Sequence, residues 1–410
     1  MELSCAVQNY AWGVKGIKSS VAQFAKATQA SLEVKDDQPF AELWMGTHPS
    51  GPSVVKGSGV NLDKYISEHL EVLGSPVAEK FQNQLPFLFK VLSVNQALSI
   101  QAHPNKAHAE ELHQSRPEVY KDPNHKPEMA IALTPFQALC GFRPEKEIIK
   151  HFTEVHELQN VIGKDLCHAF ISSPNEKNLK ACFNAMMTAS KDTIASALSE
   201  YMQRLSSLDS TKGAELLRDL FLTLHEKYPG DVGCFSIYLL NCFTLQPGEA
   251  MFLGPNVIHA YLYGDCIECM ACSDNVVRAG LTPKYQDVET LISMLEYEML
   301  PAELRKFKGN AIDKYTVSYD PPVPDFAVDM IEIPEGVPEY SLRTIDSASI
   351  IIIVEGQAKD LTISPPSPGE VTQATEVQRG SVLFLGAKQS LLLKFDGNSR
   401  FLAFRALCLL

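Results

Sequence analysis

The chain has 410 residues, of which 45% are hydrophobic and 21% are charged, as in an ordinary soluble globular protein. This length exceeds a single ordinary core, so we expect two or three domains. The formal net charge of −13 argues against general binding to nucleic acid or to an anionic membrane. An anionic substrate would therefore need a local basic pocket.

We expect neither secretion nor membrane insertion from the sequence. Residues Met1 to Cys5 lack the basic and apolar regions of a signal peptide. The longest purely aliphatic run, Ile350 to Val354, is too short to span a bilayer. Ten cysteines without a secretion signal indicate reduced thiols, and we expect a cytoplasmic protein.

The first third of the chain, to about residue 143, has β character, because proline and glycine separate short apolar runs such as 86–92. Within it, residues 99–103 read Ser-Ile-Gln-Ala-His and residues 126–128 read Lys-Pro-Glu. In strands, alternate residues share a face. A common face would gather nitrogen and oxygen donors from Gln101, His103, Glu128 and, in a later strand-like segment, His259. Such donors suit zinc, iron or manganese and predict a catalytic rather than a structural metal site.

Between about residues 145 and 228, glycine and proline become rare and apolar residues recur at helical spacing. This pattern predicts an insertion of four to six helices, with Pro174 and Asp209 as helix-start signals. Strand character returns at 234–238, and a mainly helical or irregular link follows at 287–308. From about Tyr319 to the end the sequence is again β.

An internal repeat relates residues 246–254 to residues 378–386, with Gln, Gly, Phe, Leu and Gly in register. A glycine turn that enters a short strand is typical of a small β-barrel rim. Continuing the same register places Leu391 where His259 stands, and no histidine follows His259. The repeat therefore predicts a second barrel that keeps the fold and lacks the metal.

Several long strings resemble the type I phosphomannose isomerases of the cupin superfamily. They lie at residues 8–13, 41–50, 98–106, 124–128 and 266–284. The resemblance covers nearly the whole chain and implies a mainly β fold with two cupin-type (jelly-roll) barrels and an inserted α-helical domain. It places the catalytic cupin at 1–145 and 231–310, the helical insertion at 146–230 and a metal-free cupin at 311–410.

The resemblance further implies a zinc-dependent aldose–ketose isomerase that interconverts mannose 6-phosphate and fructose 6-phosphate through a cis-enediolate. One zinc per chain would be held by Gln101, His103, Glu128 and His259. The enzyme would supply mannose donors, including GDP-mannose, for glycosylation. We expect a monomer whose partner is a small sugar phosphate.

The same resemblance makes Arg278 the catalytic arginine, although from the sequence alone this residue could lie in a solvated basic turn. The catalytic role is chemically consistent, because a fixed cation stabilises the negative charge that develops on an enediolate, and arginine stays protonated. Phosphate and hydroxyl contacts are expected from Lys284, Lys126, Lys90 and Ser99. Trp12 and Glu42 are candidate pocket-wall residues. The proton-transfer group is left open among Glu268, Asp274, Lys126 and a metal-bound water.

Three cysteines, Cys266, Cys269 and Cys272, superficially resemble half of a zinc ribbon. No second cluster exists, and in a strand Cys269 would face away from the other two. We therefore interpret them as structural. Two other functions remain as alternatives: an Fe(II) cupin oxygenase, or a sugar-binding or storage cupin without turnover.

Overall fold

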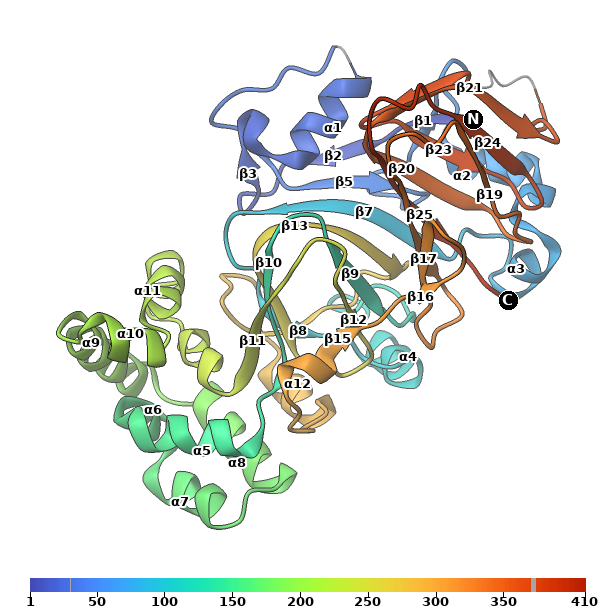
Figure 1. Ribbon diagram of the computed structural model, residues 1–410. Coiled ribbons are helices and arrows are strands. Elements are labelled where there is room, and N and C mark those ends of the chain that lie inside the picture. Colours follow the sequence, from blue (N-terminus) through green and yellow to red (C-terminus); the bar gives the residue numbers. More distant parts are fainter. Residues whose placement is uncertain (30, 370–373) are drawn as a thin grey trace.

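The computed structural model describes residues 1–29, 31–369 and 374–410 and places a group of helices at one end of a mainly β molecule (Figure 1). An eleven-stranded sheet comprises β2 (Ala6–Gln8), β5 (Glu42–Met45), β7 (Phe87–Val94), β8 (Ile100–Ala102), β9 (Glu128–Ala132), β10 (Phe136–Phe142), β11 (Leu240–Leu245), β12 (Ala250–Leu253), β13 (His259–Ala271), β14 (Val277–Gly280) and β15 (Lys306–Phe307). The long strand β13 pairs with β7, β8, β9 and β10 and so joins the parts of this sheet.

Two further sheets, called the C-terminal sheets below, lie at the other end (Figure 1). The eight-stranded one comprises β1 (Glu2–Ser4), β6 (Val54–Val55), β16 (Asn310–Ala311), β17 (Thr316–Tyr319), β18 (Ala327–Ile333), β20 (Ser349–Glu355), β23 (Val382–Leu385) and β25 (Phe401–Leu407). The four-stranded one comprises β19 (Glu339–Leu342), β21 (Gln357–Ser364), β22 (Glu376–Gln378) and β24 (Ser390–Lys394). A small sheet pairs β3 (Val14–Lys15) with β4 (Pro39–Phe40).

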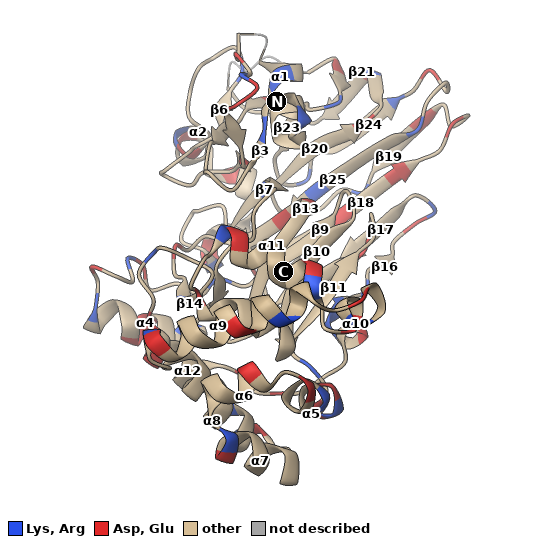
Figure 2. Ribbon diagram, turned by 90° about the vertical axis from the view of Figure 1, so that its left-hand side faces the viewer, with Lys and Arg blue, Asp and Glu red and all other residues tan. Residues whose placement is uncertain are grey.

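The segment between β10 and β11, called the insertion below, is helical. It contains α5 (Glu145–Glu154), α6 (His156–Ile162), α7 (Lys164–Ser172), α8 (Glu176–Met187), α9 (Lys191–Ser206), α10 (Ser210–Glu215), α11 (Arg218–Lys227) and a 3₁₀ helix at Val232–Tyr238. The other helices are α1 (Ser20–Thr28), α2 (Leu62–Glu68), α3 (Ser75–Lys80), α4 (Lys106–Ser115) and α12 (Val288–Met294), with 3₁₀ turns at Gly16–Lys18, Leu70–Leu73 and Ala302–Arg305. In Figure 2, many of the ribbon segments coloured as charged residues lie on helices and loops.

The mainly β architecture with a helical insertion is confirmed, but the insertion has seven α-helices rather than four to six. The additional helices arise because single residues separate α5, α6 and α7. One of them is Gly163, whose φ of +100° ends α6 in a conformation that glycine adopts without strain. The helix start at Asp209 is confirmed, since its side chain accepts a hydrogen bond from the backbone N–H of Lys212.

One expectation about local structure is wrong. Residues 234–238 belong to a 3₁₀ helix instead of a strand, and all seven of that helix's residues are buried. A short apolar run buried on every side has no periodicity that distinguishes a helix from a strand. In addition, β1 pairs with β23, and β6 pairs with β1.

The pairing of β1 joins the start of the chain to the C-terminal sheets. Leu3, opposite Val382, is almost fully buried, and β1 satisfies backbone groups of β23 that would otherwise form an open edge. The start of the chain therefore ties the C-terminal sheets to the rest of the molecule.

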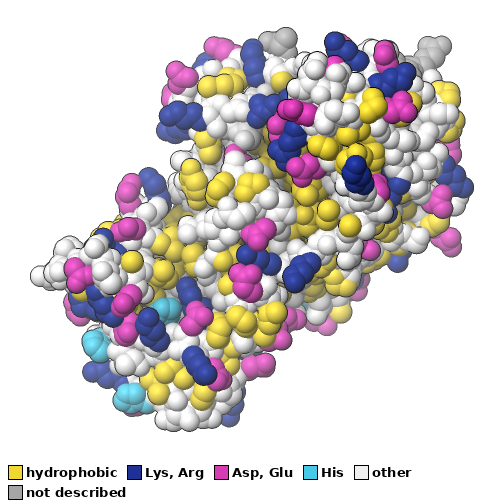
Figure 3. Space-filling model, viewed as in Figure 1, with side chains coloured by type: hydrophobic (Ala, Val, Ile, Leu, Met, Phe, Trp, Pro, Cys, Tyr) yellow, Lys and Arg dark blue, Asp and Glu magenta, His cyan; other side chains and the backbone are white. Residues whose placement is uncertain are grey.

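The internal repeat recurs in the structure. Strands β12 and β23 each follow a glycine turn with positive φ, +85° at Gly248 and +90° at Gly380. Leu391 lies in β24 and is buried in an apolar cluster. Figure 3 shows hydrophobic side chains gathered near the middle of one face, among charged ones. Within the described ranges, no helix has the length and apolar character needed to cross a membrane.

Candidate active site

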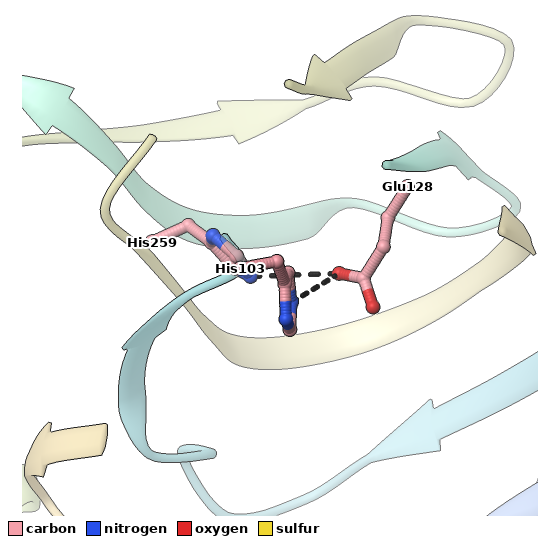
Figure 4. Close-up of side chains that lie close together, drawn as sticks. All are labelled: His103, Glu128 and His259. Carbon is pink, nitrogen blue, oxygen red and sulfur yellow. Dashed lines mark ion pairs between the residues drawn. The ribbon is translucent and has the colours of Figure 1, made fainter. Parts of the chain in front are cut away.

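Three side chains from separate strands meet in the interior of the eleven-stranded sheet (Figure 4). His103 follows β8, Glu128 begins β9 and His259 begins β13. The Oε2 atom of Glu128 lies 3.3 Å from Nε2 of His103 and 3.5 Å from Nε2 of His259. All three residues are buried, and their possible ligand atoms lie within 4.8 Å of one another.

Hydrogen bonds fix how the two imidazoles face this point. The Nδ1 atom of His103 lies 2.7 Å from the carbonyl oxygen of Asn275, and that of His259 lies 2.9 Å from the carbonyl oxygen of Val257. A carbonyl can only accept, so each Nδ1 carries the hydrogen and each Nε2 presents a lone pair. This arrangement is usual around metal-binding histidines.

The electrostatics of the cluster fit a cation. Burial lowers the pKa of His103 despite the neighbouring Glu128, which favours the neutral ring. Its Nε2 atom is buried with no hydrogen-bond partner among the described residues. Burial opposes ionisation of Glu128, yet its imidazole neighbours and Lys126 hold its pKa well below the usual range. Two lone pairs and a carboxylate thus converge without a hydrogen between them, and a divalent metal would complete the site.

Gln101 reaches the edge of the same cluster. On β8 it is paired with His259 of β13 and with Arg278 of β14. Its amide nitrogen lies 3.4 Å from Nε2 of His259, and its amide oxygen accepts a hydrogen bond of 2.9 Å from the hydroxyl of Ser99. The structure therefore brings the side chains of all four expected donors together.

A cleft of about 760 Å³ opens beside this cluster. Its lining includes every other residue selected from the sequence: Trp12, Glu42, Lys90, Ser99, Lys126, Glu268, Asp274, Arg278 and Lys284. Gln101 and Glu128 also line it, so one cavity connects the possible metal ligands with the candidate substrate contacts.

Arg278 and Lys284 supply the positive charge of the cleft. A β-bulge beside Arg278 offsets β14 against β8, a feature that redirects side chains next to active sites. Neither side chain has a hydrogen-bond or ion-pair partner within the described part of the chain. Burial lowers the pKa of Arg278, and burial together with Arg278 lowers that of Lys284. Two unpaired cations form the local basic pocket that the acidic chain was expected to need.

Lys90 differs from these two cations. Its ammonium lies 3.2 Å from Glu42 Oε2 and 3.2 Å from Glu268 Oε2, and it is buried. Glu268 Oε1 also accepts a hydrogen bond of 2.8 Å from the hydroxyl of Tyr261. Burial raises the pKa of Glu268 against the attraction of Lys90. Lys90 is therefore already surrounded by carboxylates and is less available to an anion than Lys284.

Other cleft residues were not selected from the sequence. Tyr10 stacks on Trp12 with ring centroids 5.9 Å apart, and His48 lies 3.4 Å from Asp274, whose pKa it lowers. Tyr228 and Asp231 enter the wall from the end of the insertion. His48 lies in one of the recognised strings, whereas Tyr228 and Asp231 carry no sequence signal, because only the fold brings them to the cleft.

The cysteine triplet does not form a metal site. Cys266 and Cys269 belong to different apolar clusters, as expected for opposite faces of β13. Burial raises the pKa of Cys272 to about 12, so its thiol is a poor source of thiolate. These positions support the structural interpretation of the three cysteines, and all ten cysteines of the chain are free thiols.

Comparison with known proteins gives a consistent result along the whole chain. The phosphomannose isomerase type I catalytic domain matches residues 1–145, and the helical insertion domain of that family matches residues 145–240. Mannose-6-phosphate isomerases of Rattus norvegicus and Homo sapiens are 49% and 47% identical, over 100% of this chain and 98% of each relative.

Solved structures agree. A mannose 6-phosphate isomerase bound with zinc and yttrium superposes with a TM-score of 0.82 at 35% identity. The apo form from Salmonella typhimurium gives a TM-score of 0.82 at 33% identity. Both comparisons cover 100% of this chain and 99% of the other. Full-length similarity in sequence and in fold leaves one assignment: this chain is a member of the type I phosphomannose isomerase family, and it is an isomerase.

Proposed function

We propose that this enzyme interconverts mannose 6-phosphate and fructose 6-phosphate and depends on one zinc ion per chain. The observation that carries the proposal is a buried His103–Glu128–His259 cluster that opens onto a cleft with two unpaired cations. Such a cleft suits a small anion whose reacting end is held near a metal. The relatives are named as mannose-6-phosphate isomerases, which supports the same substrate.

The metal would be held by Gln101, His103, Glu128 and His259, and the neutral amide, two imidazoles and one carboxylate suit zinc. When bound, zinc supplies a Lewis acid that polarises a substrate oxygen. Zinc would bind the amide oxygen of Gln101, so the amide, whose nitrogen faces His259 in the structure, would turn over and donate to the hydroxyl of Ser99.

In the proposed mechanism, Arg278 stabilises the negative charge of a cis-enediolate. Its guanidinium is partly buried and unpaired, so its charge is not neutralised by a protein carboxylate, as transition-state stabilisation requires. Lys284, also unpaired, would bind the phosphate, with Lys126 and Ser99 as further contacts. Trp12 and Glu42 would contact the sugar.

A proton must move between C1 and C2 of the substrate. Of the candidate groups, Glu268 is supported by its raised pKa, which brings a carboxyl toward neutral pH, where proton transfer is efficient. Asp274 is less suited because His48 lowers its pKa. Lys126 is also less suited to accept a proton, because its ammonium forms an ion pair with Glu128 Oε1 at 3.5 Å.

We extend the proposal to the chain as a whole. The catalytic strands and the C-terminal sheets would be two cupin barrels, supported by the repeat of β12 in β23. The enzyme would work as a cytoplasmic monomer, with ten free thiols suited to a reducing compartment. Its product would feed mannose donors for glycosylation.

Turnover of mannose 6-phosphate by the purified chain, with metal analysis of the same sample, tests the proposal. We expect isomerisation that a chelator abolishes and added zinc restores. Oxygen uptake with Fe(II) would favour the oxygenase. Sugar-phosphate binding without turnover would favour a binding cupin, and either result would overturn the proposed reaction.

A further inference from the structure

The end of the insertion touches the segment that carries Arg278 and Lys284. Asp231 follows α11 and begins the 3₁₀ helix at Val232–Tyr238. One of its carboxylate oxygens accepts a hydrogen bond of 2.7 Å from the backbone N–H of Gly233, and the other accepts one of 3.3 Å from the backbone N–H of Thr282. Asp231 therefore links the insertion to the loop between the two cleft cations.

Backbone packing at this contact leaves no room for side chains. A Cβ atom on Gly233 would lie 2.9 Å from the backbone nitrogen of Leu281, and one on Gly280 would lie 3.1 Å from the Cα of Gly233. Contacts below 3.4 Å involving backbone atoms cannot be relieved by a side-chain rotation. The 3₁₀ helix and the end of β14 are thus in direct backbone contact, with two glycines facing each other.

Leu281, between Gly280 and Thr282, adopts a left-handed conformation with φ of +51° and is fully buried. A non-glycine residue in this region is strained and persists only where its surroundings hold it. The Asp231 carboxylate on one side and the Leu281 side chain in the insertion core on the other are the contacts that hold it. This strained turn directs the chain from Arg278 toward Lys284.

We propose that Asp231 is a positioning residue for the Arg278–Lys284 segment, so that the insertion shapes the anion-binding side of the cleft through one carboxylate. Each oxygen of Asp231 accepts a hydrogen bond from a backbone N–H group, so the carboxylate clamps the backbone of the insertion to that of the segment. The expected change in kcat/KM rests on the proposed isomerase function. The expected change in amide exchange of the segment does not depend on that function.

The test compares Asp231→Ala with Asp231→Asn in the zinc-loaded enzyme. Loss of the clamp should lower kcat/KM by about 10- to 100-fold, because small displacements of charged groups are costly to the reaction. Asn keeps an acceptor for only one of the two N–H groups, so it should restore part of the loss. Zinc content should stay at the wild-type level in both variants, because none of the metal ligands contacts Asp231.

Asp209→Ala is the matched control. Asp209 also accepts a backbone N–H, from Lys212 at the start of α10, but it does not line the cleft. Its loss should lower the melting temperature without changing kcat or KM. A merely structural role for Asp231 predicts the same behaviour for Asp231→Ala.

A double-mutant cycle and hydrogen exchange complete the test. If Asp231 acts through this segment, Asp231→Ala should have a much smaller effect in the Lys284→Ala background. Amide exchange at 280–285 should accelerate in Asp231→Ala, a measurement that needs no substrate. Unchanged exchange would overturn the clamp, and faster exchange with unchanged kinetics would overturn its role in the reaction. A wild-type chain inactive on mannose 6-phosphate would overturn the proposed function alone, because the exchange result stands independently.

Discussion

The carboxylate of Asp325 holds Nε2 of His125 between its two oxygens, each 3.1 Å away. Asp325 precedes β18 of the C-terminal sheets, whereas His125 precedes β9, which begins at Glu128, a proposed metal ligand. Asp325 is buried, and His125 is adjacent in sequence to Lys126 in the cleft wall. The C-terminal sheets thus contact the metal-site segment directly.

Asp325→Ala should therefore affect both folding and substrate binding. Removing the carboxylate leaves the His125 side chain without its partner, which should lower the free energy of unfolding by about 1–3 kcal/mol. We also expect KM for the sugar phosphate to rise, because the segment with Lys126 loses a fixed neighbour. Tyr319→Phe is a suitable control, since it removes a hydrogen bond from β17 to the Gly248 carbonyl that does not involve the cleft. Equal KM values in the two variants would limit Asp325 to a structural role.

Metal removal tests the proposed ligands. His259→Ala and Glu128→Ala should each lower the zinc content and abolish isomerisation, because each removes a converging donor. His151→Ala is the matched control: His151 is a buried histidine whose Nδ1 also bonds to a carbonyl oxygen, that of Tyr238, but it lies in the insertion. This control should lose stability and retain its zinc. Full activity of metal-free enzyme would contradict the mechanism.

The C-terminal sheets should bind no metal of their own. Leu391 takes the repeat position of His259 and is 1% exposed in an apolar cluster. Leu391→Ala should cost about 2–5 kcal/mol of stability, as buried leucine truncations do, without changing the metal content. We expect one zinc per chain by elemental analysis, and a ratio of two would contradict the repeat argument.

Asp287 should make stability depend on acid pH. Its carboxylate accepts hydrogen bonds of 2.7 Å from Arg116 and 2.6 Å from the Tyr120 hydroxyl. Burial opposes its ionisation, but Tyr120, Thr290 and Arg116 together lower its pKa from the ordinary value of 3.8. Because the folded pKa is the lower one, this stabilisation is present above 3.8 and is lost as the pH falls through the folded value.

Asp287→Asn should accordingly lower the free energy of unfolding by about 1–3 kcal/mol at neutral pH. The difference from wild type should shrink below pH 3.8 in denaturant titrations. Asp219→Asn, at a side chain that is 89% exposed, should leave the pH profile unchanged. A difference that stays constant with pH would show that the charge of Asp287 does not contribute.

The candidate site was more predictable from the sequence than some local elements of the fold. Two short segments contain Gln101, His103 and Glu128. Their strand-like alternation and their resemblance to the family predict that these donors share a face. In the structure they lie close to His259. The run at 234–238 was assigned to the wrong element because an apolar segment buried on all sides has no period.

Other long-range pairings could not be read from the sequence. Strand β1 is only three residues long, and its partner β23 begins at Val382. The contact of Asp231 with Thr282 likewise forms because the end of the insertion returns to the cleft. No sequence motif around either residue predicts this contact. Such pairings depend on topology, which short motifs do not encode.

Substitution of Arg278 tests the proposed chemistry most directly. If its unpaired guanidinium stabilises the enediolate, Arg278→Ala should lower kcat by roughly 10²–10³-fold or more, the usual effect of losing a transition-state charge stabiliser. KM should change less, because ground-state binding would rest on Lys284, other cleft groups and the metal. Arg278→Lys should restore little of the lost kcat, because an ammonium cannot provide the paired, coplanar hydrogen-bond donors of a guanidinium.

Zinc content separates this defect from ligand loss. Arg278 is paired with Gln101 across β14 and β8, but it has no side-chain contact with His103, Glu128 or His259 that would make metal binding depend on it. Arg278→Ala should therefore bind zinc normally while turning over slowly. Steady-state kinetics and elemental analysis on the same preparation decide the matter, because a zinc-replete alanine variant with normal kcat would exclude Arg278 from the catalytic step.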